Sequence, residues 1–184
     1  NPAIELGRSF IVDAYQRRHS TLGVIWRGIG QFIVRNPRYR ILFGPVSISR
    51  DYRRLSRNLI VHWLRETSTD PLLASKISAR RPPRPRHFGI LDRAAIAHAV
   101  RDIEDVSDLI AEIEPGERGV PVLLRHYLKL NATLLSFNID PAFNNSLDGL
   151  IFVDLLRSPA KTLVRYMGAA GAEVWETSRG GDVT

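Results

Sequence analysis

The sequence predicts an α/β fold in which helices cover a mixed β-sheet. Stretches with strand-like and helix-like patterns of apolar residues follow one another in the order strand, helix, strand, helix, and then helix, strand, strand. The 184 residues suit a single domain, and 44% hydrophobic and 24% charged residues are ordinary proportions for a globular chain. Four strands make a small sheet for this length, and the first begins next to the N-terminus. We therefore expect the chain to lack N-terminal strands that a longer protein would supply.

The first expected strand contains two charged residues. Residues 4–12 are largely apolar and end in β-branched side chains, which is typical of a strand. Glu5 and Arg8 nevertheless lie three positions apart inside it, where ionised groups are costly unless they are paired. Two interpretations stay open. The pair neutralises itself and holds the sheet, or Glu5 is a functional carboxylate.

A helix and a second strand follow. Apolar residues at helical spacing predict a helix over residues 21–35, which Asn36-Pro37 ends. Ser20 or Thr21 can cap it, so the free N–H groups at its start would form an anion site beside the basic residues 16–18. A strand is expected at residues 40–48, where Gly44-Pro45 favours a bulge or an edge.

The middle of the chain is basic. Ser49 or Asp51 is expected to cap a helix that continues to about residue 65, and a short helix is expected over residues 71–78. The Pro- and Arg-rich residues 79–89 predict a loop, because proline disrupts helices and central strands. The loop is either a basic arm for phosphate or lipid head groups or a solvated connector.

The second half is acidic and contains the remaining elements. A helix over residues 92–114 should direct its acidic side chains, Glu114 among them, toward solvent. Pro121 begins another helix. Strands at 132–139 and 147–155 and a helix at 159–167 complete a domain of residues 1–168. The glycine-rich residues 169–184 are expected to be a disordered tail.

Charge and composition limit the kinds of partner. The net charge is +7, and residues 1–93 hold 18 Lys and Arg against 6 Asp and Glu. Such a field attracts an acidic protein or an anionic membrane surface. We expect no nucleic-acid partner, because no helix-turn-helix or aromatic-interleaved basic motif is present. The absence of cysteine excludes disulfides and thiolate ligands, and the carboxylate spacing predicts no metal site. We expect a cytoplasmic protein peripheral to the inner face of the membrane.

Several short runs together resemble one family. The strand and helix at residues 5–29 resemble the central strand and following helix of ornithine-lipid-type N-acyltransferases, often described as hemolysin-like, in the GNAT superfamily. The runs that carry this resemblance are Glu5-Leu6-Gly7-Arg8-Ser9-Phe10-Ile11-Val12, Tyr15-Gln16-Arg17, Leu22 and Trp26-Arg27-Gly28-Ile29. Matches continue in order at Leu42-Phe43-Gly44, Ser47-Ile48-Ser49, residues 121–130, Phe143 and Asp148. The resemblance covers residues 3–155, and acyl-homoserine-lactone synthases are similar more distantly. Chains of this kind resemble the C-terminal part of larger acyltransferase proteins.

The resemblance implies a GNAT-like fold and transfer of a fatty acyl group from a thioester to an amine, as in ornithine-lipid synthesis. Glycine comes late in residues 16–23, so the usual pyrophosphate signature is not intact. This favours the acyl-phosphopantetheine of acyl carrier protein over acyl-CoA as donor. Catalysis would involve Glu5, as proton acceptor or amine-positioning group, and its neighbour Arg8. The donor would be bound by Gln16, Arg17, Arg18, Ser47 and Ser49.

One alternative from another functional class stays open. The basic half alone would suffice for a non-catalytic module that docks a phospholipid acyltransferase to a carrier protein or a membrane.

Overall fold

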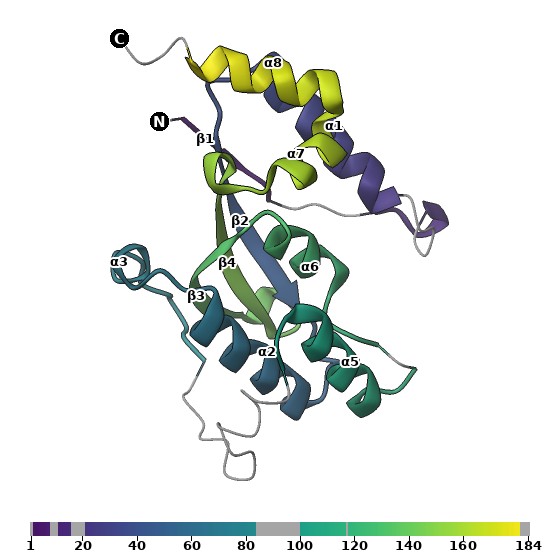
Figure 1. The fold of residues 1–184 in the computed structure, drawn as a ribbon. Coiled ribbons are helices and arrows are strands. Elements are labelled where there is room, and N and C mark those ends of the chain that lie inside the picture. The colour runs from purple at the N-terminus through teal and green to yellow at the C-terminus, as the bar shows by residue number, and fades with distance from the viewer. Residues whose placement is uncertain (1, 8–10, 16–20, 84–99, 117, 181–184) are drawn as a thin grey trace. The chain divides into compact units, whose positions relative to one another are not determined.

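The computed structural model describes residues 2–7, 11–15, 21–83, 100–116 and 118–180. These residues form an open four-stranded sheet with helices around it (Figure 1), which confirms the predicted GNAT-like α/β class. The strand order is β1-β2-β4-β3, with β1 at Ala3–Glu5, β2 at Ile41–Ile48, β3 at Thr133–Asp140 and β4 at Ser146–Asp154.

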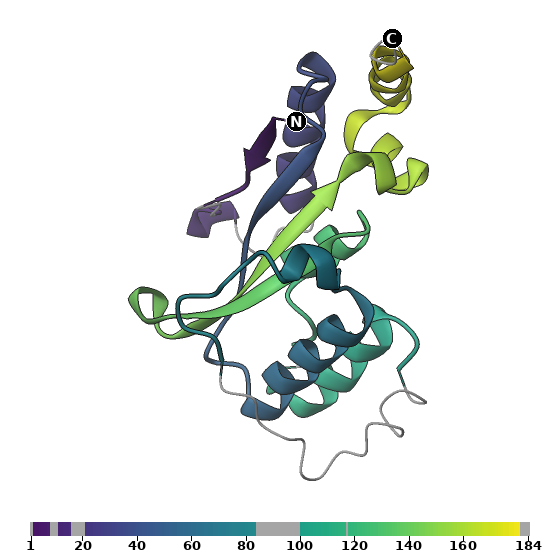
Figure 2. The ribbon, with the colours of Figure 1, turned by 90° about the vertical axis from the view of Figure 1, so that its left-hand side faces the viewer.

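The sheet is mixed. β1 runs parallel to β2, with Ala3 opposite Ile41 and Glu5 opposite Phe43. β3 and β4 are neighbours joined by only five residues, a connection that antiparallel strands allow and parallel strands do not (Figure 2).

The first strand is shorter than the sequence predicts. Leu6, Gly7, Ile11 and Val12 are not in a strand, and residues 8–10 lie outside the described part of the chain. Among the described residues, the last backbone bond from this segment toward β2 runs from the Leu6 N–H to the Phe43 carbonyl at 2.7 Å. Within the described sheet β1 lies at the edge, so the expectation of a central strand is not met there.

β2 continues without interruption through Gly44-Pro45, so the predicted bulge is absent. A Cβ atom on Gly44 would lie 2.5 Å from the Leu6 carbonyl oxygen, which shows how closely β1 approaches at this position. Pro45 has no N–H to donate, and among the described residues it follows directly after the pairing of β2 with β1. β2 lies between β1 and β4 in the sheet, so the prediction of an edge at this point stays a prediction.

The chain divides into two compact units. The first unit comprises Asn1–Gly44, Tyr127–Ala132 and Phe152–Thr184, and the second comprises Pro45–His126 and Thr133–Ile151.

Three helices pack together in the first unit: α1 at Thr21–Arg35, α7 at Ala160–Met167 and α8 at Ala169–Gly180 (Figure 1). A side chain at Gly30 would collide with the Tyr166 carbonyl, so glycine allows α1 and α7 to approach closely. The Trp26 ring stacks on the Tyr166 ring, and the edge of the Tyr127 ring meets it, both with centroids 5.2 Å away.

The expectation of a disordered tail is wrong for Ala169–Gly180, which form α8. Trp175 has 0% of its surface exposed and Ala172 is buried, so one face of this helix is anchored in the first unit. Tertiary burial of the tryptophan offsets the weak helix propensity of the glycines.

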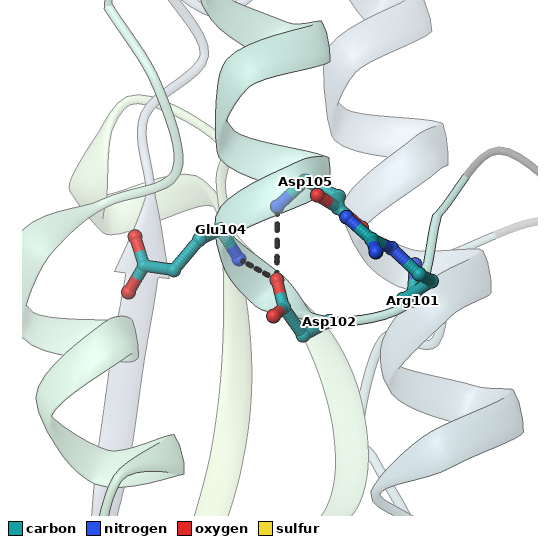
Figure 3. Close-up of polar contacts among 4 residues, drawn as sticks. All are labelled: Arg101, Asp102, Glu104 and Asp105. Atoms are coloured by element: carbon teal, nitrogen blue, oxygen red, sulfur yellow. Dashed lines mark hydrogen bonds and ion pairs between the residues drawn. The ribbon is translucent and has the colours of Figure 1, made fainter.

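The second unit pairs α2, at Arg54–Thr67, with α5, at Ile103–Ile113. The unit also contains α3 at Pro71–Ala74, and α6 at Val122–Leu128 begins within it. Asp102 caps α5 by accepting hydrogen bonds from the Glu104 and Asp105 N–H groups at 2.9 and 3.0 Å (Figure 3). Arg101 donates to Asp105, and these hydrogen bonds lower the pKa of the Asp105 carboxyl. The predicted helix over 92–114 thus begins at Ile103 among described residues, and residues 92–99 lie outside them.

The outer edge of β3 is partly covered. The Leu134 N–H donates to the Ser68 carbonyl at 2.7 Å, and the Ile139 N–H donates to the Arg81 carbonyl at 2.8 Å. The described part of the predicted basic loop, residues 79–83, therefore contacts the sheet edge, and residues 84–89 lie outside the described chain.

Candidate functional site

Glu5 is the predicted catalytic residue that the structure describes, and it ends β1 with an exposed side chain. Its carboxylate oxygen Oε1 lies 3.0 Å from the position that a Cβ atom on Gly7 would occupy. The missing side chain at residue 7 therefore leaves room for the Glu5 carboxylate. This carboxylate is open to a substrate arriving from solvent. Arg8 lies outside the described residues, so the predicted pairing with Glu5 stays a prediction.

The helix expected over residues 21–35 is confirmed as α1, Thr21–Arg35, and its role in binding a donor stays a prediction. The Thr21 hydroxyl donates to the Tyr15 carbonyl at 2.9 Å, which ties the start of α1 to the short 3-10 helix Asp13–Tyr15. The first turn of α1 has no acidic residue, so its own side chains leave the positive end of the helix dipole unneutralised. Gln16, Arg17 and Arg18 lie outside the described residues.

Ser47 and Ser49 have different surroundings in the second unit. Ser47 lies on β2 and is exposed. The Ser49 hydroxyl donates to Asp51 Oδ2 at 2.9 Å and accepts from the Asp51 N–H at 3.1 Å. Ser49 is thus already engaged in a local turn, which leaves the Ser47 hydroxyl as the more open of the two groups.

The predicted capping of α2 by Ser49 or Asp51 is wrong. The N-cap residue is Arg53, which makes no side-chain capping bond, and its backbone N–H donates to Glu114 Oε1 at 2.7 Å. Glu114 is only 4% exposed, so the expectation that it faces solvent is also wrong. The carboxylate of Glu114, the residue directly after α5, satisfies the start of α2 instead of a local side chain.

A cluster that sequence reasoning missed surrounds Glu114. The Arg118 Nη2 atom lies 3.8 Å from Glu114 Oε2, and the Arg118 guanidinium lies 4.8 Å from the centre of the Tyr52 ring. The Tyr52 hydroxyl donates to the Gly119 carbonyl at 2.8 Å, and burial raises its pKa. The sequence contains one signal that could have indicated this cluster. An acidic residue at a helix C-terminus opposes the dipole, so it indicates a tertiary partner.

The described residues contain no group of three or more His, Cys, Asp or Glu that could hold a metal ion. No helix among them is both long and apolar enough to cross a membrane.

Comparison with known proteins indicates a relationship. The chain is 28% identical over 142 residues to the glycine N(alpha)-acyltransferase of Bacteroides thetaiotaomicron. It is 25% identical over 144 residues to the glycine N(alpha)-acyltransferase of Phocaeicola vulgatus. The similarity supports an acyltransferase relationship.

These alignments cover 73% of the chain but 41% and 42% of the two relatives. The chain thus spans about two fifths of the length of the curated relatives it matches. No family model and no solved structure matches the chain.

Proposed function

We propose that the chain is part of an N-acyltransferase that moves a fatty acyl group from a thioester to the amine of an amino acid. The observation that carries this proposal is the similarity, over 73% of the chain, to two proteins named glycine N(alpha)-acyltransferase. The GNAT-like sheet and the exposed Glu5 carboxylate are compatible with it.

The proposed donor is the acyl-phosphopantetheine of acyl carrier protein, with acyl-CoA less favoured. An acidic carrier complements the basic residues 1–93, which hold 18 Lys and Arg against 6 Asp and Glu. The glycine comes late in residues 16–23, which argues against a coenzyme A pyrophosphate site. The proposed acceptor is an amino acid or aminolipid precursor, with glycine and ornithine as the two to test.

The proposed reaction is direct aminolysis. The neutral amine nitrogen attacks the thioester carbonyl carbon, so that a C–N bond forms and the C–S bond breaks. The amine loses one proton, which the Glu5 carboxylate accepts and then gives to the departing thiolate, so that the thiol leaves and the carboxylate is regenerated. Because the Glu5 carboxylate is exposed and has room above Gly7, an amine can reach it.

The test compares Glu5→Gln with Glu173→Gln, which changes an exposed glutamate on α8. The natural protein that contains this chain is supplied with acyl carrier thioester and either glycine or ornithine, and mass spectrometry follows N-acyl product. We expect Glu5→Gln to lower turnover about 100-fold or more, the usual size of general-base catalysis, and Glu173→Gln to leave turnover unchanged.

Full turnover by folded Glu5→Gln would remove Glu5 from the mechanism. No transfer by the unaltered protein to either amine, from carrier or coenzyme A thioester, would favour the non-catalytic docking module.

A further inference from the structure

One face of α1 is exposed and contains apolar side chains and arginines but no acidic group. Val24 is 60% exposed and Phe32 is 49% exposed, and Arg27 and Arg35 are exposed between and beyond them. At 3.6 residues per turn these four side chains fall within an arc of about 140° on one side of the helix. We call Val24, Arg27, Phe32 and Arg35 the α1 stripe.

The buried residues of α1 lie on the opposite face, and on the stripe side Gln31, between Arg27 and Arg35, donates to the Met167 carbonyl at 2.8 Å. The opposite face buries Trp26, Gly30 and Ile33, and α1 packs against α7 and α8 in the first unit (Figure 1). The helix therefore already has its core partners, and the exposed Val24 and Phe32 are not required for that packing.

An ordered aromatic pair lies at the end of the stripe. The Phe32 and Tyr39 rings have centroids 6.0 Å apart. The Arg38 guanidinium lies 4.8 Å from the centre of the Tyr39 ring, and Arg38 Nη2 donates to the Tyr39 hydroxyl at 3.1 Å. Tyrosine rings, which have an apolar body and a polar tip, are enriched where proteins meet the head groups of a bilayer.

The sequence around α1 contains positively charged residues and no negatively charged ones. Residues 14–44 hold six arginines and no Asp or Glu. Neighbouring carboxylates in the sequence therefore do not offset the positive potential of the α1 stripe. Each basic residue near an anionic membrane surface strengthens binding about fivefold.

We propose that the α1 stripe, together with Arg38 and Tyr39, docks the protein onto an anionic membrane surface. The rings of Phe32 and Tyr39 enter the head-group region, and the arginines pair with lipid phosphates. The stripe extends about 16 Å along the helix, which suits a plane of phosphates better than a single ligand. In one respect this docking rests on the proposed function. The proposed product, an N-acyl amino acid, is an amphiphile that partitions into a bilayer.

The test measures co-sedimentation of the full chain with vesicles of phosphatidylglycerol and phosphatidylcholine in equal amounts, and with phosphatidylcholine vesicles alone. We expect binding to the anionic vesicles that weakens as salt is raised. Arg27→Ala combined with Arg35→Ala should weaken it about 25-fold, and Phe32→Ala about tenfold. The matched changes outside the stripe, Arg165→Ala and Val174→Ala, should leave it unchanged.

Equal binding to both vesicle types, or unchanged binding of the stripe variants, would overturn the proposal. So would variants that lose binding to acyl carrier protein while they still bind vesicles, since the stripe would then face a protein partner. Circular dichroism confirms that the variants are folded, which is expected because the altered side chains are exposed.

Transfer to a soluble amine without vesicles is measured in parallel. Loss of vesicle binding with retained transfer rejects only the docking, whereas vesicle binding without any transfer rejects only the proposed function.

Discussion

Because residue 7 is a glycine, the Glu5 carboxylate can occupy the space beside it. Residues 5 and 7 face the same side of an extended chain, and Glu5 Oε1 occupies the space next to Gly7, 3.0 Å from a Cβ built there. The position of the proposed base can therefore be disturbed without changing the base itself.

Gly7→Ala should displace the Glu5 carboxylate because its methyl group would compete for the same space. The carboxylate is the end of a flexible side chain, so we expect unfolding free energy to change by less than about 0.5 kcal/mol. Turnover should fall about tenfold with an unchanged KM for the thioester, as measured by steady-state kinetics.

Gly28→Ala is the control, since no described atom lies within 4 Å of the new methyl group. It should leave turnover unchanged and stabilise α1 by about 0.5–1 kcal/mol. Unchanged turnover in Gly7→Ala would show that the placement of Glu5 does not matter.

Glu114 joins two helices of the second unit through a buried carboxylate. Glu114→Ala should lower the unfolding free energy by about 2–4 kcal/mol, because the Arg53 N–H loses its acceptor and the Arg118 guanidinium loses its ion-pair partner. Glu114→Gln keeps one acceptor oxygen for the Arg53 N–H, and it should lower the unfolding free energy by about half as much as Glu114→Ala. Urea denaturation measures both.

Glu112→Ala, at an exposed position of the same helix, should change stability by less than about 0.5 kcal/mol. If Glu114→Ala unfolds at the same urea concentration as Glu112→Ala, the carboxylate does not hold the start of α2.

At the scale of the element, α8 depends on one tryptophan. Trp175 is fully buried on a helix otherwise rich in alanine and glycine. Trp175→Ala should lower the unfolding free energy by about 3–5 kcal/mol, because it leaves a large cavity in the first unit. Thermal unfolding followed by circular dichroism tests this against Val174→Ala, whose side chain is 56% exposed. Equal midpoints for the two variants would mean that α8 is not anchored through Trp175.

The elements that the sequence predicts well are those with their own start and stop signals. The helix expected at 21–35 is found at Thr21–Arg35, because its apolar period and Asn36-Pro37 act locally. The second strand is found at Ile41–Ile48, within one residue of the prediction. Local signals predict an element correctly where tertiary contacts favour the same secondary structure.

The elements that the sequence predicts poorly depend on distant contacts. Among the described residues β1 ends at Glu5 and its bonding to β2 at Leu6, although the apolar run continues in the sequence. α8 forms because Trp175 finds a buried position against other helices, and no period in residues 169–184 indicates that. Glu114 follows an acidic pattern typical of a solvated face, yet its partner is a backbone group 61 residues away.

At the scale of the whole molecule, the described ion pairs of α5 and its flanking residues lie within the acidic half of the chain. Asp105, Glu104 and Glu114 pair with Arg101, Arg125 and Arg118. These carboxylates are thus matched to nearby arginines of residues 94–184, and their pairing leaves the positive excess of residues 1–93 in place. That excess is what the proposed carrier protein and membrane surface would bind.

Buried phenols connect the stability of both units to alkaline pH. Burial raises the pKa of Tyr52 in the second unit and of Tyr166 in the first, and it raises the pKa of Tyr127 to about 12. Unfolding returns these groups to their ordinary pKa near 10, so above that pH the unfolded chain binds fewer protons than the folded one. The contribution of these phenols to the unfolding free energy should therefore be fully present below pH 10, and it should fall as the pH rises from 10 through 12. Tyr127 alone would contribute up to about 3 kcal/mol to this fall.

Denaturant unfolding at a series of pH values between 9 and about 12 measures the decline. Tyr127→Phe removes one titrating group and should make the decline shallower by up to one proton, even where the variant is less stable throughout. A decline of the same slope in Tyr127→Phe would mean that the Tyr127 phenol ionises equally in the folded and unfolded chain, and hence that Trp26 and its neighbours do not exclude water from it.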